Sequence, residues 1–346
     1  MIGRNLYTRL WLLGLAMVLS ALLATKIGAV EISVSQILQS IGQHLGLPIQ
    51  GELPRQVDAI IWGIRLPRVL MSLLVGGALA LCGAAMQGLF RNPLADPSIL
   101  GVSTSAALTT SIAIVLLGPY LSSWQEMTGI PMLPLAAFVG AVSSIYLIFG
   151  MSRSRGKIDV SIMLLGGIAI NALAGAGIGL LTYLADDAQL RSLTFWTLGS
   201  LGGVGWKQLG IMLLALTSGL LLLLPMVKDF NALSLGETEA RHLGSPVESL
   251  KRRVVLATGL CMGVAVAFCG VIGFVGLVVP HMLRLSGGGH HHYLLPASVL
   301  AGGVLLCWAD AFSRVVVAPA ELPIGVLTAM AGSPIFLFLL LRQNRR

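Results

Sequence analysis

Apolar residues occur in long blocks separated by short polar segments. Seven blocks are clear, at residues 10–30, 67–90, 97–117, 132–151, 160–184, 208–227 and 253–283, and two more follow at 293–314 and 324–342. Because about 20 residues of α-helix cross the hydrocarbon core of a bilayer, each block predicts a membrane helix. We take the block at 10–30 as the first membrane helix rather than as a cleaved signal peptide.

The block at 253–283 is too long for one straight crossing. It contains Gly270, Gly273, Gly276 and Pro280, so we interpret it as two crossings, the second short and broken by Pro280. The alternation expected of a transmembrane β-barrel is not visible. The pattern therefore predicts an all-α polytopic bundle of about ten transmembrane helices.

The composition agrees with this pattern: 56% of the 346 residues are hydrophobic and 10% are charged, against about 25% charged in soluble domains. The net charge of +8 does not indicate nucleic-acid binding, because the basic residues are distributed by loop. With the N-terminus in the cytoplasm, fifteen Lys and Arg residues lie on the cytoplasmic side and seven on the other. The positive-inside rule then predicts that both termini are cytoplasmic.

Signals for catalysis and metal binding are weak. The sequence has no phosphate-binding G-x-x-x-x-G-K-[ST] loop, and no Ser/His/Asp cluster or carboxylate pair lies in the apolar blocks. Cys82, Cys261, Cys269 and Cys307 lie in apolar segments without C-x-x-C spacing, which indicates buried side chains. We therefore expect no catalytic residue and no metal site. His290–His292 are expected on a solvated cytoplasmic loop, with a transient substrate ligand as the alternative.

Two polar segments and the glycines carry further expectations. Ser33 with Gln36 indicates a capped helix start. The segment 228–252 is the largest on the cytoplasmic side, and we interpret it as two short helices joined at Gly244-Ser-Pro. Glycine pairs four residues apart, as at Gly175-x-x-x-Gly179, favour either tight packing within the bundle or a dimer seam.

Several motifs together resemble a known family. They are Arg65-Leu-Pro-Arg68, Gln87-Gly-Leu-Phe-Arg-Asn-Pro-Leu-Ala-Asp-Pro-Ser-Ile-Leu-Gly101, Phe195-Trp-Thr-Leu-Gly-Ser-Leu-Gly-Gly203, Leu235-Gly-Glu-Thr-Glu-Ala-Arg-His-Leu-Gly244, Gly273-Phe-Val-Gly-Leu-Val-Val-Pro-His-Met-Leu-Arg284, Ala309-Asp-Ala-Phe-Ser-Arg314 and Glu321-Leu-Pro-Ile-Gly325. The chain strongly resembles the transmembrane permeases of type II ABC importers, which carry ferric siderophores, haem and vitamin B12. The resemblance covers essentially the whole chain and implies a single permease domain, 1–346, with ten helices.

The resemblance implies that 228–252 forms the coupling helices, which would sit in a cleft of an ATPase subunit. Its functional residues would be Leu235, Gly236, Glu237, Glu239, Ala240, Arg241, Leu243 and Gly244. Three of these would form an apolar contact (Leu235, Ala240, Leu243) and three a polar rim (Glu237, Glu239, Arg241). The alternative is an ordinary connecting loop.

The resemblance also implies that Arg65, Arg68 and Arg314 receive acidic residues of a periplasmic substrate-binding protein. Two alternatives are that Arg65 and Arg68 only anchor helix ends at the headgroups, and that Arg314 pairs with Asp310 four residues before it. Asn171 and Gln87 are polar groups within helices. Interhelical hydrogen bonding is the default role for both, and lining of the pathway is the alternative.

The implied protein is a homodimeric permease of the bacterial inner membrane, embedded in membrane lipid and without a permanently bound cofactor. Two separate cytoplasmic ABC ATPase subunits would bind the ATP and drive alternating access along the dimer axis. The Phe195–Gly203 motif looks most like haem permeases, so haem is the expected substrate, with ferric siderophores and vitamin B12 as alternatives. An ion-coupled secondary transporter is disfavoured because the helix centres hold essentially no ionisable residues; a membrane scaffold is a further alternative.

Overall fold

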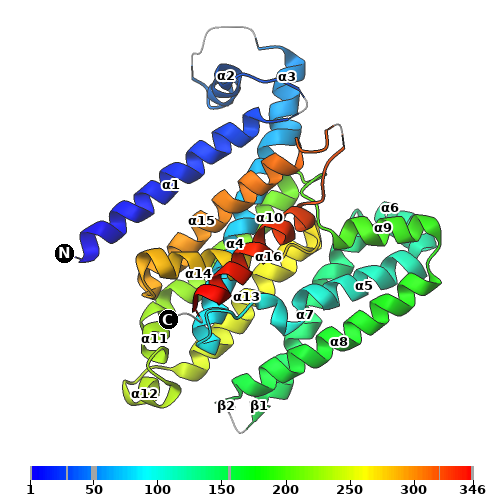
Figure 1. Ribbon diagram of the computed structural model, residues 1–346. Helices are drawn as coiled ribbons and strands as arrows, with labels where there is room; N and C mark the ends of the chain where they lie inside the picture. The colour runs from blue at the N-terminus through cyan, green and yellow to red at the C-terminus, as the bar shows by residue number, and fades with distance from the viewer. Residues whose placement is uncertain (1, 29, 48–52, 155–156, 319, 344–346) are drawn as a thin grey trace.

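The computed structural model describes residues 2–28, 30–47, 53–154, 157–318 and 320–343, and these are almost wholly helical (Figure 1). The longer helices are α1 (Ile2–Lys26), α4 (Leu66–Phe90), α5 (Val102–Leu116), α7 (Met132–Ser152), α8 (Val160–Leu184), α10 (Trp206–Leu223), α13 (Val247–Cys269), α14 (Val275–Gly287), α15 (His291–Ser313) and α16 (Ile324–Gln343). The shorter ones are α2 (Val34–His44), α3 (Arg55–Ile60), α6 (Leu121–Thr128), α9 (Asp187–Thr197), α11 (Val227–Leu233) and α12 (Glu237–His242).

Short turns of other helix types and one small hairpin complete the description. A π-helical segment η1 (Ile61–Arg65) joins α3 to α4, and 3-10 turns lie at η2 (Pro97–Leu100), η3 (Gly118–Tyr120) and η4 (Leu224–Met226). Strand β1 (Arg153–Ser154) pairs antiparallel with β2 (Lys157–Ile158), directly before α8.

Helix α4 is the centre of the bundle. It packs against α1, α10, α13, α14 and α15, and most of its residues are buried. Glycines allow the closest of these approaches: a Cβ at Gly83 would lie 1.8 Å from the carbonyl oxygen of Gly276 on α14. A second group, α5 with α7 and α8, joins the first mainly through α7 and α13. The all-α membrane fold predicted from the apolar blocks is therefore confirmed.

Not every expected crossing is equally long. Seven of the described helical segments are long and apolar enough to span a bilayer, and the bent pair α5 with η3–α6 would be an eighth. Helices α14 and α16 occupy two of the other predicted positions, but α14 has only 13 residues and the apolar part of α16 is short. The count of ten crossings remains a prediction.

The 253–283 block divides into two helices as expected, and the second is short, but Pro280 does not break it. Helix α13 ends at Cys269 and α14 begins at Val275, and Pro280 lies inside a continuous α14. The turn is made where the backbone has positive φ, at Gly270 (68°) and Phe274 (66°). Pro280 cannot donate a hydrogen bond to the Gly276 carbonyl. That oxygen instead faces Gly83 of α4, so the helix continues past the proline.

The polar segments of the sequence gather at the two ends of the bundle. Helices α2, α3, α6 and α9 lie at one end, and α11, α12 and the β1–β2 hairpin lie at the other (Figure 1). The predicted cap of α2 is confirmed, because Ser33 accepts the Gln36 N–H and the Gln36 side chain bonds back to the Ser33 N–H. Helix α1 is tied to the α11–α12 end of the bundle by an Arg9 hydrogen bond to the Ser286 carbonyl.

Two short helices do form in 228–252, but their junction differs from the prediction. Helices α11 and α12 are joined at Ser234–Gly236, and Gly244-Ser245-Pro246 connects α12 to α13. Gly236 adopts φ 133° and Gly244 adopts φ 80°, conformations that favour glycine. Gly236 is the residue that precedes α12 and Gly244 follows its last turn, and the sequence pattern revealed only the second of them.

Candidate coupling and docking sites

The exposed tip of the α11–α12 segment presents two leucines. Leu235 is 66% exposed and Leu243 is 67% exposed, on either side of α12. Ala240, which was expected beside them, is fully buried in the core of the bundle. It therefore holds α12 on its own chain and cannot belong to an exposed apolar contact. Thr238, Glu239 and Arg241 are exposed around the two leucines. The apolar contact with a polar rim remains a prediction for the exposed residues.

Gly236 is favoured by its backbone angle, φ 133°. A Cβ at this position would lie 1.9 Å from a carboxylate oxygen of Glu239, but that exposed side chain can move away. A side chain here would therefore mainly strain the turn that separates α11 from α12.

An ion network fixes α12 to the bundle. Arg241 Nη2 binds Glu237 at 2.7 Å and also binds Glu248 on α13. Lys251 Nζ binds Glu237 Oε1 at 2.9 Å and the carbonyl oxygen of Ile158 at 2.7 Å. Burial alone would raise the pKa of Glu237, but the hydrogen bonds from Arg241 and Lys251 outweigh it and hold the pKa below its ordinary value. Glu237 therefore acts as a charged partner within the chain.

Two of the three expected docking arginines, Arg68 and Arg314, meet around Asp310 at the opposite end of the bundle. Arg68 Nε binds Asp310 Oδ1 at 2.9 Å, and Arg314 Nε lies 3.2 Å from Asp310 Oδ2. Arg68 Nη1 also binds Glu321 Oε1 at 2.9 Å. The interpretation that Arg314 pairs with Asp310 is thus confirmed, and the same carboxylate also binds Arg68.

The three arginines are largely buried within the chain. Arg65 is 5% exposed and Arg68 is 9% exposed. Arg65 donates to the carbonyls of Thr25, Lys26 and Val30, and Arg314 donates to those of Ala24 and Ile27. These bonds close the end of α1 onto α4 and α15. Of the carboxylates in this cluster, Glu321 is the exposed one, at 47% of its side chain.

Asn171 and Gln87 both make the interhelical bonds that were their default role. The Asn171 carbonyl accepts from Thr104 of α5, and its amide lies 3.4 Å from the carbonyls of Ser98 and Ile99. Gln87 of α4 donates to the Leu277 carbonyl of α14 at 3.1 Å. Pathway lining by either residue remains a prediction.

The three histidines do not form one solvated loop. His291 is buried as the first residue of α15, where it stacks on Phe230 and binds Asn231 Oδ1 at 3.0 Å. His290 and His292 are exposed. Among the described residues, no group of three or more His, Cys, Asp or Glu side chains is placed to hold a metal ion.

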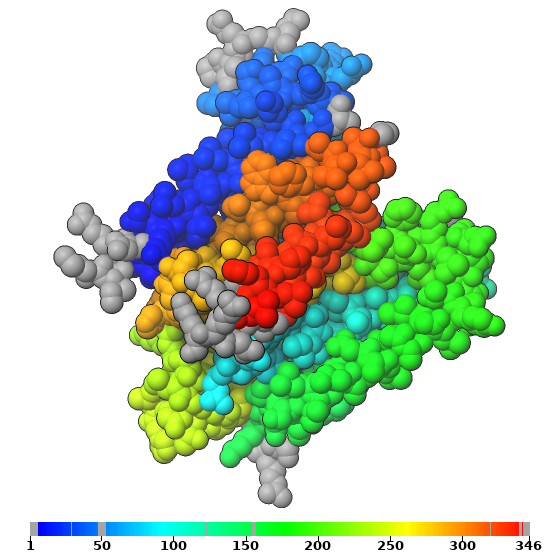
Figure 2. Space-filling view, in the orientation of Figure 1, coloured from blue at the N-terminus to red at the C-terminus, as the bar shows by residue number. Residues whose placement is uncertain are grey.

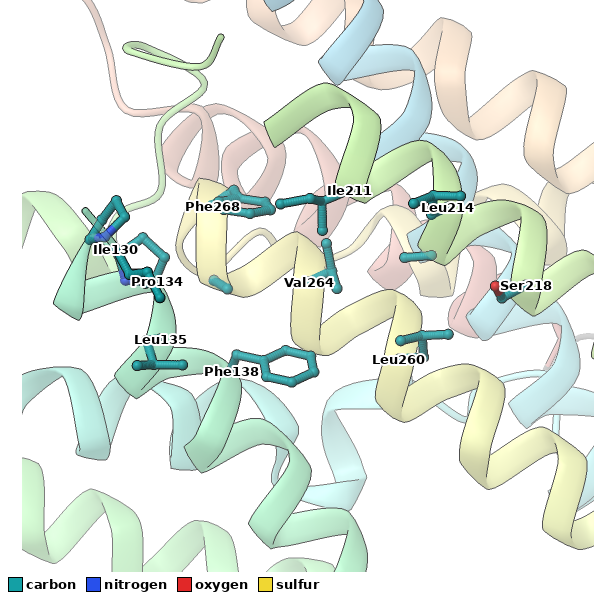
Figure 3. Close-up of a pocket in the computed structure, with 13 residues that line it drawn as sticks. Ile130, Pro134, Leu135, Phe138, Ile211, Leu214, Ser218, Leu260, Val264 and Phe268 are labelled. Carbon is teal, nitrogen blue, oxygen red and sulfur yellow. The ribbon is translucent and has the colours of Figure 1, made fainter. Parts of the chain in front are cut away.

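An apolar groove of about 410 Å³ opens between α7 and α10, over α13 (Figure 3). Phe138 of α7, Leu214 of α10 and Val264 of α13 face it, and Ser218 contributes its hydroxyl. The other lining side chains are apolar. A surface of this kind suits contact with hydrocarbon rather than with a charged solute.

Sequence reasoning missed Lys251, Glu248 and Ile158, which complete the ion network. Lys251 lies within the basic run Lys251-Arg252-Arg253, which was counted only as a positive-inside signal. The available signal was Glu248, three residues before Lys251 on the same helix face. No local pattern in the sequence links either residue to Ile158, which lies about 90 positions earlier.

Comparison with known proteins identifies the family. Residues 15–342 match the FecCD transport family. The chain belongs to this family. It is 46% identical over 290 residues to the hemin transport system permease protein HmuU of Yersinia pestis, covering 83% of this chain and 84% of that protein. It is 40% identical over 339 residues to the vitamin B12 import system permease protein BtuC of Klebsiella pneumoniae, covering 98% and 96%.

Solved structures agree with the fold. A structure described as an inward-facing conformation of a metal-chelate type ABC transporter superposes with a TM-score of 0.81 and 30% identity, covering 96% of this chain and 98% of that chain. PsaBC from Streptococcus pneumoniae gives a TM-score of 0.51 at 18% identity, covering 79% and 90%, and supports the fold alone. The FecCD-family chain is thus a permease subunit of a type II ABC importer and a polytopic inner-membrane protein.

Proposed function

We propose that this permease imports haem across the bacterial inner membrane. The support is the 46% identity to a hemin permease, against 40–41% to the vitamin B12 permeases. The margin is small and the hemin match covers less of the chain, so a ferric siderophore or vitamin B12 remains the alternative substrate. Haem is flat and largely apolar, which suits a pathway between apolar helices.

The observation that carries an ATP-driven mechanism is the geometry of α12. Leu235 and Leu243 stand exposed on a short helix that ion pairs hold against α13. An apolar centre surrounded by polar side chains is the usual anatomy of a protein–protein contact. We infer that this surface binds a cytoplasmic ABC ATPase subunit, with one such subunit on each copy of the permease, and that the ATPases supply the hydrolysis.

The proposed homodimer would form along α8. Most of this helix is exposed, and Figure 2 shows α8 (green) and α16 (red) on the surface that faces the viewer. Gly175 and Gly179 have no neighbour within 4 Å of a Cβ position. Small residues four apart let a second helix approach closely in lipid. A dimer seam at α8 would place the pathway, with Asn171 on the same helix, on the two-fold axis; lipid would cover the other apolar faces, including the groove of Figure 3.

The binding protein would dock at the opposite end, on the α2–α3 side of the bundle. Arg65 and Arg314 are occupied by backbone carbonyls, so they would shape this surface. Arg68 can exchange a partner, because its Glu321 contact is half exposed. We propose that an acidic residue of the binding protein competes with Glu321 for Arg68.

The test is ATPase stimulation of the reconstituted complex. The permease is co-purified with its ATPase subunit, placed in lipid vesicles and mixed with binding proteins loaded with haemin, a ferric siderophore or cyanocobalamin. Haem import predicts the largest stimulation, and uptake, with the haemin-loaded protein. Stimulation by another ligand alone would reassign the substrate. Failure to bind any ATPase subunit would favour an ion-coupled transporter or a scaffold instead.

A further inference from the structure

Lys251 is a fully enclosed lysine at the point where three elements meet. Its side chain is 2% exposed. Its ammonium group binds Glu237 of α12 at 2.9 Å and the Ile158 carbonyl of β2 at 2.7 Å, and lies 3.5 Å from Glu248, one turn earlier on its own helix α13. One charged group therefore connects α12, α13 and the strand that leads into α8.

The segment that leads into the first turn of α8 is held by two hydrogen bonds to the backbone of Ile158, one to its carbonyl and one from its N–H. Lys251 binds the Ile158 carbonyl, and Glu248 Oε2 accepts the Ile158 backbone N–H at 2.7 Å. Ile158 itself is buried, and Asp159 after it caps α8 by accepting the backbone N–H groups of Ser161 and Ile162. A displacement of Ile158 is thus passed to the first turn of α8 through rigid backbone.

Apart from the Lys251 side chain, the space between α12 and the first turn of α8 is poorly filled. A cavity of about 530 Å³ lies there, lined by residues of five elements (α4, β2, α8, α12 and α13) and their adjoining turns, among them Arg91, Lys157, Glu237 and Lys251. Helix α12 packs against α11 and α13. The Lys251 side chain is therefore a polar bridge across a gap that apolar packing does not close.

A structural role alone explains this arrangement poorly. Enclosing a lysine costs desolvation energy, and replacing a buried ion pair by apolar side chains of similar size is often neutral or stabilising. The Lys251 bridge instead connects the exposed helix α12 to one residue, Ile158, directly before α8.

We propose that Lys251 is a positioning residue that transmits displacement of α12 to α8. The proposal rests on the proposed function, in which α12 binds an ATPase and α8 lines the pathway. When nucleotide moves the ATPase subunits, Glu237 would pull on Lys251, and Lys251 and Glu248 together would shift Ile158. Contact between two sites through a continuous polar network has the form that energetic coupling takes in other proteins.

The test is hydrogen–deuterium exchange on the complete permease–ATPase complex in lipid nanodiscs, with and without magnesium ATP and vanadate. Two peptides are followed, one covering 234–244 and one covering 157–166. The variant Lys251→Met removes the ammonium group and keeps the side-chain length. Arg252→Met removes the same charge one residue later, at an exposed position, and Lys251→Arg restores a donor.

In the wild type, Arg252→Met and Lys251→Arg, nucleotide should change exchange in both peptides. In Lys251→Met, the 234–244 response should persist while the 157–166 response falls about threefold or more. An unchanged 157–166 response in Lys251→Met, or its loss in Arg252→Met as well, would overturn the proposal. If the wild-type complex does not assemble, or if nucleotide leaves hydrogen–deuterium exchange in its 234–244 peptide unchanged, the proposed function itself has failed.

Discussion

Asp310 is the residue on which the arginine cluster depends. It is 1% exposed and binds the guanidinium groups of both Arg68 and Arg314. Glu321 shares only Arg68, and it is half exposed. Arg68 and Arg314 are both buried against the one buried carboxylate. Removing that carboxylate would leave each guanidinium with its desolvation cost and without its partner, which destabilises the folded state.

Replacing Asp310 by Asn should therefore destabilise the protein strongly. The variant keeps the shape of the side chain but leaves Arg68 and Arg314 without the carboxylate charge that they share. We expect the free energy of unfolding to fall by roughly 3–5 kcal/mol. The matched variant Glu321→Gln removes an exposed partner and should cost less than about 1 kcal/mol. Denaturant unfolding in detergent measures both. Equal stability of the two variants would mean that Asp310 does not hold the cluster together.

Residue roles were visible in the sequence only where partners are close along the chain. Ser33 with Gln36 and Asp310 with Arg314 were read from spacings of three and four. Arg68 with Asp310 was not, because 242 positions separate them. The burial of Arg65 was also missed, because the carbonyls that it binds belong to the end of α1 and the turn after it.

Helix α8 differs from the central helices in how its glycines are used. On α4, Gly76 and Gly83 lie against the backbone of α15 and α14, and a Cβ would meet a carbonyl oxygen at 2.2 Å and 1.8 Å. On α8, Gly167 lies against the Ile99 carbonyl in the same way. Gly175 and Gly179 have open space beside them, so this part of α8 leaves room for the close approach of a second helix, as the proposed dimer requires.

Filling this surface should weaken the dimer and leave the fold intact. In Gly179→Leu the added side chain would meet the second copy, and we expect a loss of about 1–3 kcal/mol of association free energy. Gly210→Leu is the control, because Gly210 on α10 also has no neighbour within 4 Å and is exposed. Native mass spectrometry reports the dimer fraction. Equal dimer fractions for the two variants would show that the dimer interface does not lie at Gly179 of α8.

Hydropathy predicted the helices well because lipid forces nearly every long apolar segment to satisfy its own backbone. It could not place the interruptions. The break between α13 and α14 falls at Gly270–Phe274, where the Ser200 N–H binds the Cys269 carbonyl at 2.8 Å. Such a turn depends on a distant loop for its hydrogen bonds. The break expected at Pro280, within the second helix, does not occur.

At the scale of the whole molecule, the two ends of the bundle have different characters. One end holds the α11–α12 segment, the β1–β2 hairpin and the basic run Lys251–Arg253 (Figure 1). The other holds α2, α3, α6 and α9, where Arg68 and Arg314 pair with Asp310 and Glu321. The excess of Lys and Arg, fifteen against seven in the predicted topology, lies at the α11–α12 end.

The positive-inside rule then predicts that the α11–α12 end faces the cytoplasm. Ser234, between α11 and α12, and Ser35, on α2, are both exposed, and the four native cysteines are buried, so single Ser→Cys variants can be labelled selectively. A membrane-impermeant maleimide should label Ser234→Cys in inside-out vesicles and Ser35→Cys in intact spheroplasts, with little labelling in the converse preparations. Each variant is the control for the other, because both carry the same substitution on an exposed polar segment. Reversed labelling would place α12 outside the cell, where no cytoplasmic ATPase could reach Leu235 and Leu243, and the proposed coupling would fail with it.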